Sequence, residues 1–221
     1  MPGFEFFGPE ERKHVNDVLE TGILMRYGFD GPRKGIWKAK ELEEAICETF
    51  GCKHAQLVSS GTAALTTAMS ALGIGYGDEI ILPSFTFVAS FEAVISVGAI
   101  PVFVDVDDTL TLNPTAVRNA ITSKTKCIMP VHMCGSMADM DALQSICKEH
   151  DLILLEDACQ SIGGTYKGKK LGTIGDAGTF SFDFVKTITC AEGGVIMTNR
   201  EDVYISSDGY TDHGHDHKGA D

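Results

Sequence analysis

The chain has 221 residues, of which 43% are hydrophobic and 22% are charged, the composition of a globular protein with one large domain and a substantial core. Its formal net charge at pH 7 is −13, which disfavours a surface for nucleic acid or anionic membrane but still permits a local phosphate pocket. No apolar run reaches transmembrane length, and the first residues lack the basic and apolar regions of a secretory signal.

Strand and helix patterns alternate from about residue 39 onward. We therefore expect residues 1–38 to form an N-terminal arm and helix, and residues 39–221 to form the large domain. Helical spacing and a proline suited to a first helical turn predict helices over 39–50, 62–72, 87–97, 114–121 and 139–149. Short apolar runs predict strands over 55–58, 79–82, 101–104, 127–131, 152–155, 178–182 and 194–198.

The predicted strands are short and apolar without alternation, which is typical of a parallel or mixed sheet covered by helices on both faces. Their repeated strand–helix–strand order predicts an α/β layered domain. Ligands of such domains bind outside the carboxyl ends of the strands. Several distinctive segments fall at those ends, so we expect them to gather at one rim: 59–62, 84–87, His132, 157–160 and 181–186.

Lys186 and Asp157 are the residue types that the chemistry of pyridoxal phosphate (PLP) requires. A lysine amine can hold the aldehyde of this cofactor covalently. A buried carboxylate can keep the pyridine nitrogen protonated, so that the ring accepts electrons from the substrate. Asp157 follows an apolar strand, where an unpaired carboxylate would be costly. The alternative for the two residues taken alone is a surface lysine and an aspartate that caps the next turn.

Residues 59–62 join a predicted strand to a predicted helix and suit an anion. Gly61 permits close backbone approach, Thr62 offers a hydroxyl, and the first-turn amides together with the helix dipole favour a phosphate. Ser181, shortly before Lys186, could add a ligand. The alternative is an ordinary serine/threonine helix cap, and the local sequence favours neither.

Three further residues each have a functional and a structural interpretation. Phe87 could stack on a flat heteroaromatic ring, although a phenylalanine at the start of an apolar helix usually belongs to the core. Gln160 could hydrogen-bond a ring hydroxyl. His132 ends a predicted strand and could face substrate or cofactor, with a satisfied structural histidine as the alternative.

The histidine run at 213–217 suggests a metal site, but its spacing does not match a helical pair and no distant ligand set accompanies it. We therefore expect no metal. The seven cysteines are odd in number and lack a C-x-x-C motif, which predicts reduced thiols in a cytoplasmic protein. Nothing near Cys159 or Cys190 indicates a base for a catalytic thiolate.

Taken in order, several segments resemble the DegT/DnrJ/EryC1/StrS family of sugar aminotransferases, which have the fold-type I PLP-dependent architecture: 60–65, 86–89, 98–105, 130–132, 156–160, 181–186 and 192–194. The resemblance implies that Lys186 holds PLP and moves a proton, and that Asp157 pairs with the pyridine nitrogen. It also implies a homodimer. The remaining cofactor contacts that it implies are the ring hydroxyl for Gln160, the ring face for Phe87, and the phosphate for Thr62, Ala63 and Ser181.

The segments 4–12, 26–31, 182–186 and 211–217 are similar to a subgroup of this family that acts in lipopolysaccharide biosynthesis. That likeness implies transfer of an amino group from glutamate to the 8-oxo form of 3-deoxy-manno-octulosonate. The alternatives are a nucleotide-sugar aminotransferase and a PLP-dependent sugar dehydratase of the same family. Since some of these dehydratases replace the lysine with histidine, Lys186 favours transamination. A truncated, non-catalytic PLP-binding or assembly partner is the alternative from another class.

Members of the family continue into a smaller carboxyl-terminal domain, whereas this chain stops at Asp221. We therefore expect a fold-type I large domain without the small domain, which normally supplies substrate contacts. The sequence leaves open whether a chain of this length is active by itself.

Overall fold

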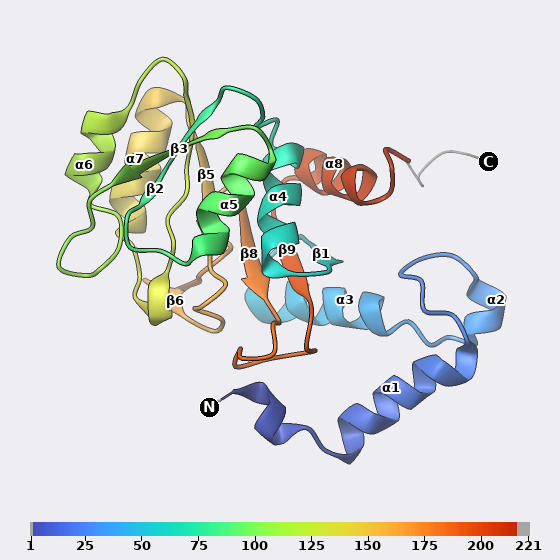
Figure 1. Ribbon diagram of the computed structural model, residues 1–221. Helices are drawn as coiled ribbons and strands as arrows, with labels where there is room; N and C mark the ends of the chain where they lie inside the picture. Colours follow the sequence, from blue (N-terminus) through green and yellow to red (C-terminus); the bar gives the residue numbers. More distant parts are fainter. Residues whose placement is uncertain (1, 216–221) are drawn as a thin grey trace.

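The computed structural model describes residues 2–215 and is built around one seven-stranded sheet (Figure 1). The strand order is β1-β9-β8-β5-β4-β2-β3. β9 runs antiparallel to β1 and β8, and the other neighbouring pairs are parallel, so the predicted mostly parallel α/β sheet is confirmed. The strands are β1 (His54–Val58), β2 (Glu79–Pro83), β3 (Ile100–Val104), β4 (Thr125–Ile128), β5 (Ile153–Asp157), β8 (Ala177–Ser181) and β9 (Gly194–Thr198).

Helices connect most of these strands, and a small hairpin follows β5. The hairpin consists of β6 (Thr165–Tyr166) and β7 (Lys169–Lys170). The helices are α1 (Pro9–Thr21), α2 (Asp30–Arg33), α3 (Lys38–Phe50), α4 (Gly61–Ala71), α5 (Val88–Ser96), α6 (Pro114–Ala120), α7 (Met140–His150) and α8 (Glu201–Thr211), with short 3₁₀ turns η1 (Gly3–Phe6) and η2 (Met133–Gly135).

The core lies on both faces of the sheet because successive strand residues point to opposite sides. In β2, Ile80 and Leu82 join a cluster with side chains of α4, α5 and α8. Ile81 points the other way, into a cluster with α6 and α7. In β9, Val195 joins a third cluster with α3, while Ile196 belongs to the first. The helices therefore cover both faces, as predicted (Figure 1).

Several helix ends follow from local sequence chemistry. The N-cap Ser60 Oγ accepts the N–H of Ala63 (3.0 Å) at the start of α4. Asn113 caps α6 in the same way, with Pro114 at the first helical position. At the other end of a helix, Gly51 takes a left-handed conformation (φ 75°) that ends α3.

The structure differs from the predicted elements at two strands, and it has elements that were not predicted. β4 ends at Ile128 rather than at residue 131, and β5 continues to Asp157, whose N–H bonds to the carbonyl of Pro130 (2.9 Å). Asp157 is therefore the last residue of a strand rather than part of the following loop. The β6–β7 hairpin and helix α8 were not predicted. α8 buries only Val203 and Ser207, so its sequence has no apolar stripe.

The N-terminal segment lies apart from this layered body (Figure 1). Among residues 2–37 only Arg33 is buried, and α1 has no buried residue. The guanidinium of Arg33 donates to the carbonyls of Met25, Tyr27 and Gly28, which closes the loop before α2. No helix within residues 2–215 combines the length and apolarity needed to cross a membrane.

Candidate active site

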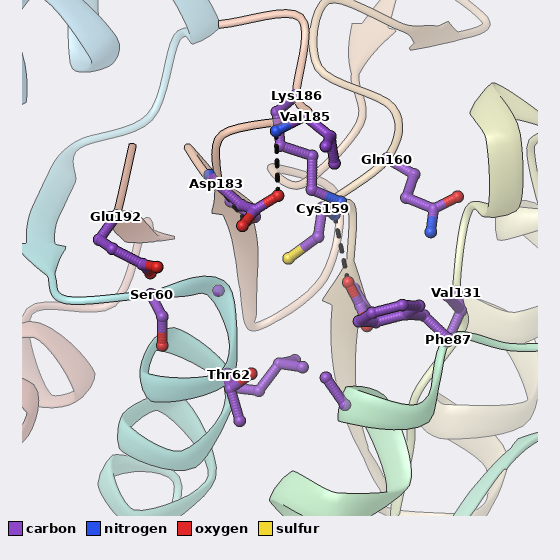
Figure 2. A pocket seen from close by; sticks show the side chains of 15 residues that line it. Ser60, Thr62, Phe87, Val131, Cys159, Gln160, Asp183, Val185, Lys186 and Glu192 are labelled. Carbon is purple, nitrogen blue, oxygen red and sulfur yellow. Dashed lines mark hydrogen bonds between the residues drawn. The ribbon is translucent and has the colours of Figure 1, made fainter. Parts of the chain in front are cut away.

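A cavity of about 330 Å³ lies at the rim formed by the carboxyl ends of the parallel strands (Figure 2). Its walls come from the β1–α4 junction, the start of α5, the end of β5, the end of β8 and the loop before β9. The residues that line it are Ser60, Gly61, Thr62, Leu65, Phe87, Ala89, Val131, Asp157, Cys159, Gln160, Ser181, Asp183, Val185, Lys186 and Glu192. The rim predicted from the strand order is therefore a single cavity, and it includes most of the predicted cofactor-binding residues.

Asp157 is fixed at the base of this cavity. It is 4% exposed, and its Oδ1 accepts the backbone N–H of Cys159 (3.1 Å). Its Oδ2 accepts the hydroxyl of the fully buried Ser90 (2.7 Å). The hydroxyl of Thr86 in turn donates to Ser90 Oγ (2.8 Å). These hydrogen bonds hold the carboxylate of Asp157 in one orientation at the base of the cavity.

Ser90 is a site residue that the sequence analysis missed. It occupies a fully buried position of the apolar helix α5, among residues that pack on the sheet. A buried hydroxyl needs a hydrogen-bond partner, and here that partner is Asp157. A lone polar residue on the apolar face of a predicted helix is the signal that could have found it.

Lys186 enters the cavity from the loop between β8 and β9, and Phe87 faces it from the N-cap of α5. Lys186 Nζ lies 5.8 Å from the centroid of the Phe87 ring, and no hydrogen bond or ion pair engages this amine within residues 2–215. Phe87 is 54% exposed and so does not belong to the core. The other charged residues on the cavity wall are acidic: Asp157, Asp183 and Glu192.

The start of α4 at Gly61 packs closely against Ser181 and Cys159, and this part of the cavity wall is called the cradle below. A Cβ at Gly61 would lie 2.8 Å from Cβ of Ser181, closer than real Cβ atoms approach, and at a tight 3.0 Å from Sγ of Cys159. Only glycine therefore lets the first turn of α4 approach Ser181. The N–H of Ala63 already bonds to Ser60 Oγ (3.0 Å), so in this structure Ala63 contributes to the helix cap.

Of the two residues predicted to contact cofactor or substrate, Gln160 faces the cavity and His132 does not. Gln160 lines the cavity and accepts the N–H of Cys134 through Oε1 (3.1 Å). Figure 2 shows its amide on the same side as Phe87 and Val131. His132 is fully buried and does not line the cavity.

Both ring nitrogens of His132 are engaged with the protein interior. Nε2 lies 3.2 Å from Oε2 of the buried Glu156, and Nδ1 accepts the N–H of Ala138 (3.4 Å). Glu156 also accepts three backbone N–H groups, from Gly172, Ile174 and Gly175. These are the hydrogen bonds of a structural histidine, which was the alternative to a substrate contact for His132.

The cysteines near the site do not have the surroundings of nucleophiles. Burial raises the pKa of the Cys159 thiol, and the negative charge of Asp157 raises it further. Cys190 points its thiol at the carbonyl of Glu192 (3.1 Å). Of the 213–217 histidine run, the structure describes residues only as far as His215, and residues 2–215 contain no cluster of three or more metal-ligating side chains.

The residues present fit PLP. An amine, a flat exposed ring and a buried carboxylate face one cavity. The start of α4 and Ser181 also line it, and a helix start with a nearby hydroxyl suits a phosphate. The acidic walls suit an amine and a protonated ring, because each carboxylate attracts positive charge.

The sequence model of the DegT/DnrJ/EryC1/StrS aminotransferase family matches residues 7–221. The chain belongs to this family. Among solved structures it is similar to the aminotransferase from Psychrobacter cryohalolentis, with 36% identity and a TM-score of 0.89 over 96% of this chain and 52% of that one. It is also similar to NtdA from Bacillus subtilis with the bound cofactor PMP (30% identity, TM-score 0.85, 99% of this chain and 48% of that one).

A third similar structure is PseC from Helicobacter pylori, an aminotransferase involved in the biosynthesis of pseudoaminic acid. It shares 30% identity with a TM-score of 0.85, over 94% of this chain and 54% of that one. The chain thus spans about half the length of each of these three proteins.

Proposed function

We propose that this DegT/DnrJ/EryC1/StrS chain is the cofactor-binding part of a PLP-dependent aminotransferase that moves an amino group from glutamate to a keto or aldehyde sugar. The observation that carries the proposal is the meeting of Lys186, Asp157 and Phe87 at one cavity. The family match and the PMP-bound relative add support.

In this proposal each residue has a distinct task. The Lys186 amine would attach the cofactor, and as a free amine it would accept the proton from the donor's α-carbon and return it to the cofactor. Asp157 holds a proton on the ring nitrogen. Phe87 covers one ring face and excludes water, Gln160 bonds the ring hydroxyl, and the amides of α4 with Thr62 and Ser181 bind the phosphate. When bound, PLP supplies the electron sink that makes the α-proton acidic.

We propose the 8-oxo form of 3-deoxy-manno-octulosonate as the acceptor sugar. Support comes from the likeness of segments 4–12, 26–31, 182–186 and 211–217 to the subgroup that acts in lipopolysaccharide biosynthesis. Arg26, in the second of these segments, donates to Asp208 of α8 (2.8 Å), three residues before the fourth segment begins. The homodimer implied by the resemblance and the cytoplasmic location predicted from the cysteines belong to the same proposal.

The test is an absorption spectrum of the purified chain with PLP, recorded before and after glutamate is added. We expect a visible band that Lys186→Ala abolishes and that glutamate converts to the band of the pyridoxamine form. Lys186→Arg is the matched control, since it keeps the positive charge without the nucleophilic amine.

Each other result assigns a different function. A Lys186-dependent band that glutamate leaves unchanged indicates a non-catalytic binder or another amino donor. When the acceptor sugar is added as well, loss of a sugar hydroxyl without appearance of an amino sugar indicates the dehydratase. If no band forms at all, a chain of this length is not an enzyme by itself.

A further inference from the structure

In the Lys186 loop (residues 182–193), the side chains next to the lysine are exposed rather than packed in the core. Phe184, Val185 and Ile188 are 52%, 67% and 54% exposed. The hydrogen bonds next to the lysine are local: its own N–H donates to the carbonyl of Asp183 (2.9 Å), and the N–H of Val185 donates to Asp183 Oδ1 (3.1 Å). Such bonds shape a turn but do not fix it relative to the rest of the protein.

The contacts that do fix this turn come from the N-terminal arm (residues 3–6, the 3₁₀ turn η1), which lies beside the loop in Figure 1. The N–H of Gly3 donates to the backbone carbonyl of Lys186 (2.8 Å). One residue on, the ring of Phe4 stacks on Phe184 with a centroid distance of 4.5 Å and an interplanar angle of 3°. Both contacts are made within two residues of the lysine.

The fit between arm and loop depends on glycine at position 3. A Cβ there would lie 2.6 Å from the carbonyl oxygen of Thr187 and 3.2 Å from Cγ2 of Thr189. No residue of the arm is buried, so core packing does not hold it in this place. The hydrogen bond and the ring stack are therefore the described contacts that dock the arm on the loop.

We propose that the N-terminal arm is a positioning element for the Lys186 amine. Docking of Gly3 and Phe4 fixes the main chain at Lys186 and thereby sets where Nζ lies in the cavity, close to the Phe87 ring. The inference rests on the proposed role of Lys186. A proton-transfer group that is misplaced by about 1 Å can lose up to about 100-fold in rate, so an undocked arm slows the reaction without touching the substrate.

The test compares Phe4→Ala with two controls in the full chain. Phe6→Ala removes a neighbouring ring of the same arm that is 69% exposed. Phe4→Tyr keeps the stacking face. The first readout needs no cofactor: it is the hydrogen exchange of the backbone amides of residues 184–188. The second is the single-turnover rate with PLP and glutamate, measured over a range of glutamate concentrations. Thermal unfolding of each variant checks that the fold is kept.

In Phe4→Ala we expect the loop amides to exchange hydrogen several-fold faster and the single-turnover rate to fall about tenfold. The glutamate concentration that gives half the maximal rate should change less than about twofold. Phe6→Ala and Phe4→Tyr should behave like the unaltered chain. The inference is overturned if exchange in the loop is unchanged, or if exchange accelerates while the turnover rate stays the same. If the unaltered chain binds no PLP, the proposed function fails, and the exchange comparison alone decides whether the arm holds the loop.

Discussion

Asp157 and Lys186 line the same cavity but are held there in opposite ways. Asp157 ends a central strand, is 4% exposed, and has hydrogen-bond donors at both carboxylate oxygens. Lys186 sits in a loop whose neighbouring side chains are more than half exposed, and its amine lies over the Phe87 ring. The carboxylate belongs to the rigid sheet, whereas the amine is carried by a separate loop.

This difference matches the two tasks that we propose. A group that holds one proton on a ring nitrogen works best when it is fixed, because preorganised charge needs no rearrangement during the reaction. A group that first attaches a cofactor and then moves a proton between atoms needs a side chain that can move while its main chain stays in place. The predictions below separate the fixed partner from the movable one.

Lys186→Ala should have the largest effect. Removal of the attaching and proton-transferring amine should lower the rate of the glutamate half-reaction by at least about 10⁴-fold. Stopped-flow absorbance of the PLP-loaded chain measures this rate. An added small amine should restore part of the rate, since it replaces the proton-transfer group; retention of more than a tenth of the activity would place the proton transfer elsewhere.

Asp157→Asn should follow, with a loss of about 10³-fold in the same rate, because the neutral amide no longer holds a proton on the ring nitrogen. The change keeps the size of the side chain and an oxygen for the Ser90 hydroxyl. Equilibrium dialysis should show PLP still bound. A rate within tenfold of the unaltered chain would contradict the role given to Asp157.

Gly61→Ala should act on binding rather than on proton transfer. Its new methyl group meets Ser181 and Cys159, so we expect the free energy of unfolding to fall by about 1–3 kcal/mol and the affinity for PLP to decrease. Gly75→Ala is the matched control, because a Cβ there meets nothing within 4 Å. Urea unfolding and PLP titration measure both quantities; equal behaviour of the two variants would argue against the cradle.

Ser90→Ala should have the smallest effect of the four, about tenfold on the half-reaction rate, since it removes one of two donors to Asp157. Ser90→Thr keeps the hydroxyl and should retain most of the rate. The double variant with Ser90→Ala and Asp157→Asn gives a second check. If Ser90 acts through Asp157, Ser90→Ala should lower the rate of Asp157→Asn less than it lowers the rate of the unaltered chain.

Much of this molecule follows from local sequence patterns. The seven strands of the large sheet and the helices from residue 38 to residue 150 were predicted. The gathering of Gly61, Phe87, Asp157 and Lys186 at one rim was also predicted, because chain order places the carboxyl ends of the strands together. The small shifts at β4 and β5 arise from pairing between strands, which no single segment encodes.

The features that were not predicted depend on contacts between distant residues. Ser90 is recognisable as a site residue only once α5 is placed beside β5. The hydrogen bond from Gly3 to Lys186 joins residues that lie 183 positions apart in the chain, and no local pattern marks Gly3 as a contact residue. His132 could point to the cavity or to Glu156, and packing alone decides this.

The most direct test of the account is to reduce the PLP-loaded chain with borohydride and map the labelled peptide by mass spectrometry. Reduction makes the bond between cofactor and amine permanent, so it identifies the lysine that holds PLP. We predict a single labelled site, Lys186. A label on another lysine, or no label under conditions that saturate the chain with PLP, would contradict the account.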